Sequence, residues 1–346
     1  MIARSGMKIS TLAFLFNVRR HNPDPNNPES HLDVDFDDPL TIKWIIKHLE
    51  NIGYKVIAIE ADEQAYLKLF KLRQQIDFAF DFSFGLYGIN KYGHIPGMLE
   101  MLRIPFTSSS SFTRNLTLNK VKMKQMLLAN KVPTLPFEVF QSTQVIKKRK
   151  LKYPLIVKPI AQGSSAGISN ASIVNSDHKL KKQVNFIIKT FSAAAFVEPF
   201  LSYREFSVAM LGNPPIILPI IEPDFSLLPK KYLPIDSLEV KWIFEKEADE
   251  IHLTCPAKID DNLRRKIKNI AFRTWEVLDI YDFCRIDMRT DKQNNIFVLD
   301  VNAPPGLIPP EVSDPSYFPI AANAAGIEYE QMLKIIMDSA IKRYKI

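Results

Sequence analysis

The alternation of apolar and polar residues along the first hundred positions predicts strands and helices in turn. Apolar runs at 12–16 and 54–59 predict two strands. Between them, apolar residues recur at helical spacing from position 42 to 52, with Asp38-Pro39 at the start and Gly53 at the stop. Because strands that alternate with helices usually form a parallel sheet with right-handed crossovers, we expect a parallel α/β sheet here.

A third strand is predicted where aromatic residues alternate with smaller or polar ones. Every second residue of this stretch is a phenylalanine, namely Phe78, Phe80, Phe82 and Phe84. Side chains two residues apart share a face of a strand, so the four rings would lie together. We interpret them as the packed face of a sheet rather than as a platform for a ligand. The Pro-rich segment 22–38 is polar and is expected to be a loop.

Two runs near the C-terminus, 284–289 and 297–302, also alternate between apolar and polar residues and predict a pair of strands. The polar segment 290–295 between them predicts a turn. A symmetric hairpin would bring four polar side chains to one face, because residues two apart share a face of a strand. A β-bulge would break this parity.

The four polar side chains of the predicted hairpin can carry chemistry. Arg285 would oppose Asn302, and Asp287 would oppose Asp300. Two carboxylates and an amide oxygen suit Mg²⁺ that is bound together with substrate phosphates. A guanidinium beside them can neutralise charge on a transferring phosphoryl group. A solvated hairpin face without a ligand is the alternative interpretation.

A predicted strand at 155–159 leads into a loop of small residues that could hold phosphate. Lys158 lies near the end of this strand, and the loop 163–167 contains two glycines and two serines. Small residues let backbone N–H groups approach a phosphate, and the lysine can reach the same anion. An ordinary hairpin turn is the alternative. The sequence contains neither a Walker phosphate loop nor a GxGxxG fingerprint, so a nucleotide would be held in another way.

The stretch 196–201 predicts a strand that runs into a connector, and 204–208 predicts the start of the next strand. An adenine could lie against apolar side chains here and bond to the connector's backbone, while an acid takes the ribose hydroxyls. Glu198 and Glu205 are the acids of this segment. Considered alone, each would more often be an acid on a solvated surface.

The composition is that of a soluble globular protein. A chain of 346 residues is long for one core, so two or three domains are expected. With 46% hydrophobic and 24% charged residues, the chain resembles ordinary soluble proteins. The net charge of +7 suits anionic ligands such as nucleotides. The one dense basic run, 147–152, is interpreted as a solvated loop, so no nucleic-acid partner is expected.

Several features favour a cytoplasmic location. Cys255 and Cys284 form neither a disulfide framework nor a metal-ligand set, which fits a reducing compartment. The apolar run 12–16 is short and continues into Arg19-Arg20, so a strand is favoured over a signal peptide. No apolar stretch approaches the length of a membrane span, and no membrane partner is expected.

The order of these segments resembles that of the ATP-grasp superfamily, and within it the chain looks most like the D-alanine–D-alanine ligases. The segments that carry the resemblance are Lys120, Lys158 with the loop 163–167, the stretch 198–205, Arg285 with Asp287, and the run 300–306. Shorter pieces at 95–106, 254–257 and 324–329 support it. Before position 97 only the α/β pattern matches.

The resemblance implies a fold of the α/β and α+β classes. An N-terminal Rossmann-like pre-ATP-grasp domain at 1–116 would precede a two-lobed ATP-grasp fold. The small lobe would span 117–202, and the large lobe with the metal site would span 203–346.

The resemblance also implies that ATP is the cofactor and assigns residues to it. Lys120 and Lys158 would contact the phosphates, Ser165 and the loop amides would cover them, and Ser164 would lie nearer the acyl phosphate. The remaining nucleotide contacts would come from Glu198, Phe200 and Leu201 around the adenine and from Glu205 at the ribose.

In this family the metal ions and the reaction meet at the hairpin. Asp287, Asp300 and Asn302 would hold two Mg²⁺, with Mn²⁺ as an alternative metal. Arg285 would steady the transferred phosphoryl group. The implied reaction activates a carboxylate as an acyl phosphate, after which an amine attacks to give an amide, ADP and phosphate.

The chain departs from the ligase pattern around the substrates. The family's acids on the first loop and after a His-Gly pair have no counterpart in 17–23 or 87–94. Lys241-Trp242 is the nearest match to a Lys-Tyr pair on the family's mobile loop. Asp300 stands where the family usually has glutamate.

A further departure concerns the Ser-Leu pair that binds the second substrate's carboxylate in the family. Glu311 falls near the place of that serine, although the Pro309-Pro310 insertion could bring Ser313 there instead. A carboxylate opposite Glu311 would be repelled, so D-alanine is expected to be a poor amine acceptor.

The sequence therefore predicts an ATP-dependent carboxylate–amine ligase that acts on small amino-acid or carboxylate substrates, as a monomer or a homodimer. Authentic D-alanyl-D-alanine synthesis is the alternative within the family. A nucleotide-binding scaffold that has lost ligation is the alternative from another class.

Overall fold

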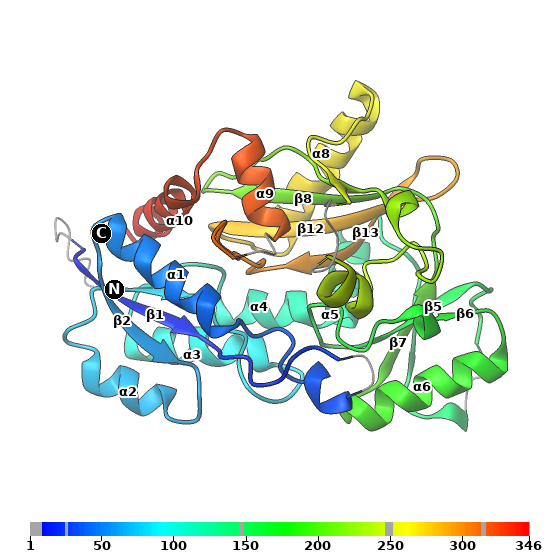
Figure 1. Cartoon of the computed structure of the whole chain (residues 1–346), viewed down its shortest axis with the longest axis horizontal. Helices are drawn as coiled ribbons and strands as arrows, with labels where there is room; N and C mark the ends of the chain where they lie inside the picture. Colours follow the sequence, from blue (N-terminus) through cyan, green and yellow to red (C-terminus); the bar gives the residue numbers. More distant parts are fainter. Residues whose placement is uncertain (1–8, 25–26, 145–148, 246–251, 313–315, 346) are drawn as a thin grey trace.

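The computed structural model of the chain describes residues 9–24, 27–144, 149–245, 252–312 and 316–345. Within these residues the strands form a three-stranded sheet, two four-stranded sheets and a two-stranded ribbon. In Figure 1 the three-stranded sheet lies at the left of the molecule, and one four-stranded sheet lies at the right. The other four-stranded sheet occupies the upper middle.

The first sheet is parallel, as the sequence pattern predicts. Its strand order is β2-β1-β3. Its strands are β1 (Thr11–Phe16), β2 (Lys55–Glu60) and β3 (Phe78–Asp81), and the helices that follow them are α1 (Pro39–Asn51), α2 (Ala65–Leu72) and α3 (His94–Leu102). Helix α1 begins where predicted, because the Asp38 carboxylate accepts hydrogen bonds from the backbone N–H groups of Leu40 and Thr41. Pro39 stands in its first turn.

The four alternating phenylalanines belong to the core, as predicted. Strand β3 contains only Phe78 and Phe80, but Phe82 and Phe84 beyond its end are buried as well. Phe80 lies 6.0 Å from Phe14 of β1, measured between ring centroids. The rings pack in one cluster with residues of α1 and of the C-terminal helix α10 (Tyr329–Tyr344). Their role is therefore to hold the sheet between its helices.

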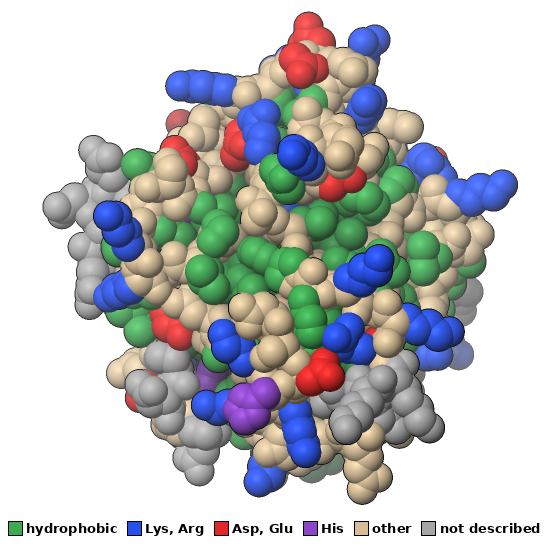
Figure 2. Space-filling view, turned by 90° about the vertical axis from the view of Figure 1, so that its right-hand side faces the viewer, with side chains coloured by type: hydrophobic (Ala, Val, Ile, Leu, Met, Phe, Trp, Pro, Cys, Tyr) green, Lys and Arg blue, Asp and Glu red, His purple; other side chains and the backbone are tan. Residues whose placement is uncertain are grey.

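The second sheet is antiparallel and carries the predicted lysine strand. Its order is β4 (Glu138–Phe140), β7 (Ala195–Pro199), β5 (Leu155–Pro159) and β6 (Ile173–Val174). Helix α6 (Asp177–Phe191) covers it with Leu180, Val184 and Ile187. Figure 2 views the side of the molecule that carries β5 and β6, where apolar side chains gather at the centre with lysines and arginines around them.

The third sheet contains the predicted hairpin. Its order is β13 (Ile296–Asn302), β12 (Phe283–Thr290), β8 (Glu205–Leu211) and β9 (Ile216–Ile217), all antiparallel. Arg285 pairs with Asn302, and Asp287 pairs with Asp300, as the symmetric hairpin predicts. A bulge follows Asp287 on the side of the turn, so it leaves these two pairs in register.

The two faces of the third sheet have different partners. Ile286 and Met288 are buried in a core with helix α8 (Asp261–Val277) and helix α5 (Lys120–Ala129). Because side chains alternate along a strand, Arg285 and Asp287 project from the opposite face. The same strand therefore joins a hydrophobic core to a polar surface.

The remaining elements connect the sheets. They are η1 (Pro28–His31), η2 (Lys91–Gly93), α4 (Ser111–Leu118), η4 (Asn170–Ser172), β10 (Glu222–Pro223), η5 (Phe225–Leu227), η6 (Val240–Phe244), β11 (Leu253–Thr254) and α9 (Tyr317–Ala324). Strands β10 and β11 form the antiparallel ribbon. Among the described residues, no helix combines the length and the apolar character needed to span a membrane.

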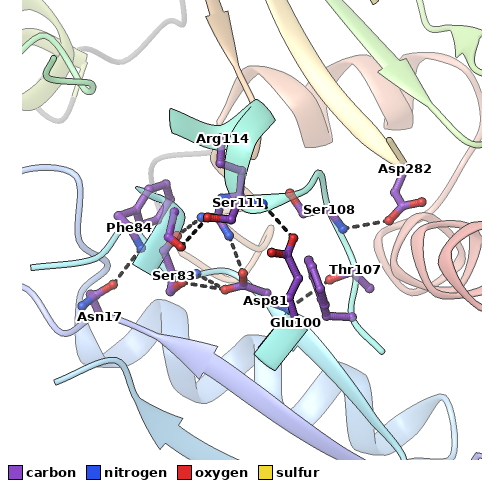
Figure 3. Close-up of polar contacts among 12 residues, drawn as sticks. Asn17, Asp81, Ser83, Phe84, Glu100, Thr107, Ser108, Ser111, Arg114 and Asp282 are labelled. Carbon is purple, nitrogen blue, oxygen red and sulfur yellow. Dashed lines mark hydrogen bonds and ion pairs between the residues drawn. The ribbon is translucent and has the colours of Figure 1, made fainter. Parts of the chain in front are cut away.

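A buried polar network joins the parallel sheet to the helices that follow it (Figure 3). Arg114 of α4 is fully buried, pairs with Asp81 at the end of β3 and donates to the carbonyl of Ser83. The backbone N–H of Ser108 donates to Asp282, which directly precedes β12. The network fixes the ends of β3 and β12 relative to one another.

The domain limits at 116 and 202 remain a prediction.

Candidate active site

A cavity lies between the two four-stranded sheets, and residues from distant parts of the chain line it. All twelve site residues predicted from the sequence border it: Lys120, Lys158, Ser164, Ser165, Glu198, Phe200, Leu201, Glu205, Arg285, Asp287, Asp300 and Asn302. The sequence analysis did not assign other residues that line the same cavity, among them Gln162, Ile235, Asp236 and Arg289. Folding thus brings the predicted residues into one place.

The hairpin face is organised around the carboxylate of Asp287. Arg285 donates to it from Nε and Nη2, each at 2.9 Å, and Asn302 donates from Nδ2 at 2.9 Å. Ser207 of β8 donates its hydroxyl at 2.6 Å. Burial acts to raise the pKa of Asp287, but Arg285, the Ser207 hydroxyl and Lys241 together hold that pKa below its usual range. The carboxylate is therefore charged in the folded protein.

The second hairpin carboxylate is paired with a lysine from α5. Lys120 Nζ lies 2.6 Å from Asp300 Oδ2 and donates to the carbonyl of Gln162 at 3.2 Å. Lys120 is buried and stands at the start of α5, whose first turn Asn119 caps by accepting from Lys122 N. The lysine thus links the hairpin to the segment that leads into the phosphate loop.

Glu198 lies between two lysines rather than on the surface. Its carboxylate is 2.9 Å from Lys158 Nζ and 2.8 Å from Lys124 Nζ. Burial acts to raise the pKa of Glu198, but these two cations together lower it to about 2. Lys124 also donates to the hydroxyl of Thr134 at 2.7 Å. The sequence analysis did not identify Lys124, although it stands one helical turn after Lys120 on the same face of α5.

The third polar residue on the inward face of β12 is Arg289, which the sequence analysis also missed. It pairs directly across the sheet with Glu205, and its Nη2 lies 2.6 Å from Glu205 Oε2. Its spacing was informative, because Arg285, Asp287 and Arg289 follow one another at intervals of two and so share a face.

The predicted phosphate loop has the backbone that its small residues allow. Ser164, Ser165 and Gly167 have φ angles of 47°, 60° and 70°, in the left-handed region. A Cβ on Gly163 would lie 2.6 Å from the hydroxyl of Tyr92 and 2.7 Å from Oδ1 of Asp35. A larger residue at position 163 would therefore need the loop or these two buried side chains to shift, because another segment packs against the glycine.

That other segment is the N-terminal stretch 31–37, which the sequence analysis describes only as a polar loop. Asp33, Val34 and Asp35 are buried in it. Lys91 Nζ lies 3.1 Å from Asp35 Oδ2 and donates to Gln162 Oε1 at 3.0 Å. These contacts attach the N-terminal part of the chain to the phosphate loop.

The stretch around Lys241-Trp242 also contacts the phosphate loop. The indole N–H of Trp242 donates to the Ser164 carbonyl at 3.4 Å, and Arg19 lies over the indole ring at 4.6 Å. The hydroxyl of Ser165 donates to the carbonyl of Asp236 at 2.6 Å. These contacts hold the stretch 236–242 against the phosphate loop.

Glu311, which the sequence analysis places near an acceptor carboxylate, pairs with a histidine of α1 and is not among the residues that line the cavity. Its Oε2 lies 3.1 Å from His48 Nε2 of α1, and Ser313 falls outside the described residues. Ser316 instead directly precedes α9, accepts from Ile308 N at 3.1 Å and donates to the Gly306 carbonyl at 2.7 Å. The Ser316-Tyr317 pair therefore follows the final Pro-Gly in space.

Comparisons with known proteins agree with this arrangement. The family model described as D-ala D-ala ligase C-terminus matches residues 112–338. The D-alanine–D-alanine ligase of Aquifex aeolicus (strain VF5) is 29% identical over 298 residues, which cover 86% of this chain and 93% of that protein. The ligase of Carboxydothermus hydrogenoformans is 30% identical over 309 residues, covering 85% and 90%.

Another relative and a solved structure complete the comparison. A Sinorhizobium fredii protein described as "Uncharacterized protein y4sG" is 29% identical over 311 residues, 87% of each chain. The crystal structure of D-alanine–D-alanine ligase from Bacillus anthracis complexed with ATP has a TM-score of 0.71 at 19% identity, covering 97% of this chain and 99% of that one. This likeness shows the fold.

Proposed function

The chain belongs to the D-alanine–D-alanine ligase family, and from this premise we propose that it is an ATP-dependent ligase that joins a carboxylate to an amine. One observation carries the proposal. Two buried lysines, the loop 163–167 and the Arg285–Asp287 face of the hairpin line a single cavity. Cations for phosphates and oxygen ligands for a metal thus lie together, as transfer of a phosphoryl group requires.

ATP would bind with its phosphates between the loop 163–167 and the two lysines. Lys158 pairs with Glu198, and Lys120 pairs with Asp300. Phosphate oxygens would either replace these carboxylates as partners of the lysines or bind the lysines beside them. The backbone of the connector at Phe200 and Leu201 would border the adenine, with Glu205 at the ribose. The position of Glu198 between two lysines supports a role in orienting Lys158 toward the phosphates.

The residues present fit magnesium. Asp287, Asp300 and Asn302 supply carboxylate and amide oxygens on one face, which is the donor set that Mg²⁺ prefers, and Mn²⁺ accepts the same ligands. When bound, such an ion would neutralise the phosphate oxygens. Arg285 and Lys120, which now pair with Asp287 and Asp300, would be released toward the phosphates.

The chain's own residues would support two successive displacements. A carboxylate oxygen of the first substrate attacks the γ-phosphorus of ATP, and ADP leaves. The amine of the second substrate then attacks the acyl carbon and loses a proton, and phosphate leaves with the oxygen that it gained from the carboxylate. Arg285 would stabilise the charge on the transferred phosphoryl group in the first step. The loop amides and Ser164 would hold the acyl phosphate until the amine arrives.

D-Alanyl-D-alanine synthesis is the second candidate, and one observation favours it. The Glu311 carboxylate contacts His48, which also contacts Glu330, and Glu311 is not among the residues that line the cavity, so the reason for expecting it to repel an acceptor carboxylate is weakened. Ser316 and the first backbone N–H groups of α9 instead support an acceptor that carries a carboxylate. We therefore replace the expectation that D-alanine is a poor acceptor with the proposal that D-alanine belongs among the acceptors to be tested first.

A screen of amino-acid pairs tests the proposed function. Purified protein, ATP and Mg²⁺ are incubated with each pair, ADP release is recorded, and products are identified by mass spectrometry. We expect ADP release that depends on both substrates, with a dipeptide or amide as product. ATP binding without any pair-dependent ADP release would favour the nucleotide-binding scaffold instead.

A further inference from the structure

Arg289 is buried beside the proposed nucleotide site and contacts three separate segments of the chain. It is 3% exposed, yet it lines the cavity. Its Nη1 donates to the carbonyl of Leu201 at 2.6 Å, and its Nη2 donates to the carbonyl of Pro234 at 2.7 Å. The same Nη2 lies 2.6 Å from Glu205 Oε2. One guanidinium thus fixes the connector, the loop near 234 and the acid expected at the ribose.

The rings around Arg289 restrict it further. The guanidinium carbon lies 5.5 Å from the ring centroid of Phe200 and 5.4 Å from that of Phe225. Two aromatic faces and two carbonyls leave the planar group little freedom to turn. Arg289 is therefore a rigid support for Glu205, which stands directly opposite it on β8.

The geometry of the ion pair determines which oxygen of Glu205 remains available. Arg289 engages Oε2 of Glu205. Among the described residues, the ion pair leaves Oε1 as the carboxylate oxygen that can accept a further hydrogen bond. A carboxylate fixed by one oxygen presents the other in a defined direction. Without Arg289, the Glu205 side chain could rotate and the connector would lose a bond to Leu201.

We propose that Arg289 is a positioning residue that sets the enzyme's selectivity for the sugar of its nucleotide. By holding Glu205 it fixes the acceptor for one ribose hydroxyl, so that nucleotides lacking this hydroxyl are rejected. Sites that are built to hydrogen-bond a hydroxyl reject analogues lacking it, because a buried polar group is then left unpaired. The inference rests on the proposed function, in which Glu205 faces the ribose.

Binding of ATP and of its 2′-deoxy and 3′-deoxy analogues tests the inference. Affinities are measured by calorimetry with Mg²⁺ and without other substrates, for the wild-type protein and for Arg289→Met. We expect the wild type to bind ATP at least about tenfold more tightly than one of the two deoxy analogues. In Arg289→Met the ratio of the two dissociation constants, deoxy analogue over ATP, should fall to about two or less. The reason is that the variant loses affinity for ATP but little affinity for that deoxy analogue.

A purely structural role for Arg289 predicts a different result. If the variant loses affinity for all three nucleotides by the same factor, so that the ratio is unchanged, the inference is overturned. Arg273→Met is the matched control, because Arg273 of α8 also donates to two backbone carbonyls, those of Asn130 and Lys131, outside the cavity. The control should keep the wild-type ratio.

Two further variants cover the case in which Arg289→Met does not fold. Arg289→Lys keeps the charge but not the planar fork, and it should lower the ratio partly. Glu205→Ala should bring the ratio to about one. Adding Arg289→Lys to Glu205→Ala should not change the ratio further, because the arginine acts through Glu205. Wild-type protein that binds no ATP would contradict the proposed function. Wild-type protein that binds all three nucleotides equally would contradict this inference alone.

Discussion

At the scale of single residues, the site is a set of ion pairs. Arg285 pairs with Asp287, Lys120 with Asp300, Lys158 with Glu198, and Arg289 with Glu205. Buried charges are costly unless paired, so each partner offsets the cost of the other. In two of these pairs, Arg285–Asp287 and Lys120–Asp300, the cation is assigned to the phosphates and the acid to the metal, so we propose that phosphates and metal bind together. We expect metal-free ATP and ATP-free metal to bind weakly.

The residue-scale assignment of the metal ligands is tested by Asp287→Asn and Asp300→Asn. Each change keeps the shape of the side chain but removes the charge that would hold a cation, so turnover should fall about a hundredfold or more. The control is Asp338→Asn on the exposed side of α10, which should retain wild-type turnover. Turnover is measured by ADP release at saturating Mg²⁺. A hairpin variant that turns over at the wild-type rate would remove the assignment.

Lys158→Ala tests the phosphate contact. A charge-assisted hydrogen bond contributes about 1.5–3 kcal/mol, so ATP should bind at least about tenfold more weakly. Lys152→Ala, at an exposed position before β5, is the control and should leave affinity unchanged. Calorimetric titration with a non-hydrolysable ATP analogue measures both. Equal affinities of the Lys158→Ala variant and the wild type would exclude Lys158 from the phosphate site.

The residues that the sequence analysis missed share a physical reason. Lys124 and Arg289 are charged residues whose patterns are also typical of solvated helix and strand faces. Their burial depends on partners far away in sequence, Glu198 for Lys124 and Glu205 for Arg289. The predicted residues, by contrast, lie in an order of segments that resembles the ATP-grasp superfamily.

At the scale of elements, the sequence pattern predicted those strands, helix starts and pairings that depend on residues close together in the chain. The strands of the parallel sheet, the start of α1 and the pairing of β12 with β13 follow from alternation, capping and a short turn. The segment 31–37 could not be predicted in this way. It is buried because it packs against the phosphate loop, about 130 residues later in the chain.

Gly163→Ala tests the contact between these two elements. The added methyl would lie within 2.7 Å of buried Tyr92 and Asp35, so either the loop or these two side chains must shift. We expect ATP affinity to fall and the melting temperature to drop. Gly97→Ala in α3 is the matched control, because its methyl would meet only Ser111 at 3.5 Å and alanine favours a helix. A Gly163→Ala protein with unchanged affinity and melting temperature would show that the segments do not pack as described.

At the scale of the whole molecule, one buried acid links stability to pH. The Oδ2 atom of Asp37 is buried and has no hydrogen-bond partner among the described residues. Burial raises the pKa of Asp37 from 3.8 to about 8, although Arg19 opposes the shift. Between these values the folded protein keeps a proton that the unfolded chain releases. The contribution of Asp37 to stability is therefore fully present below pH 3.8 and is lost as pH rises toward 8.

Asp37→Asn should remove this dependence on pH. The variant's free energy of unfolding, relative to the wild type, should be higher at pH 8 than at pH 5, by at most about 1.4 kcal/mol per pH unit. Urea denaturation at the two pH values measures the difference. The same difference between variant and wild type at both pH values would mean that Asp37 titrates normally in the folded protein.

We propose that the molecule transfers phosphate from ATP to a carboxylate and then forms an amide. The most direct measurement uses the best substrate pair with the donor carboxylate labelled with ¹⁸O, and it follows the label by mass spectrometry of the released phosphate. An acyl phosphate leaves its bridging oxygen with phosphate, so the account predicts one ¹⁸O in each phosphate and one amide bond for each ADP. Unlabelled phosphate, or ADP released without an amide product, would contradict it.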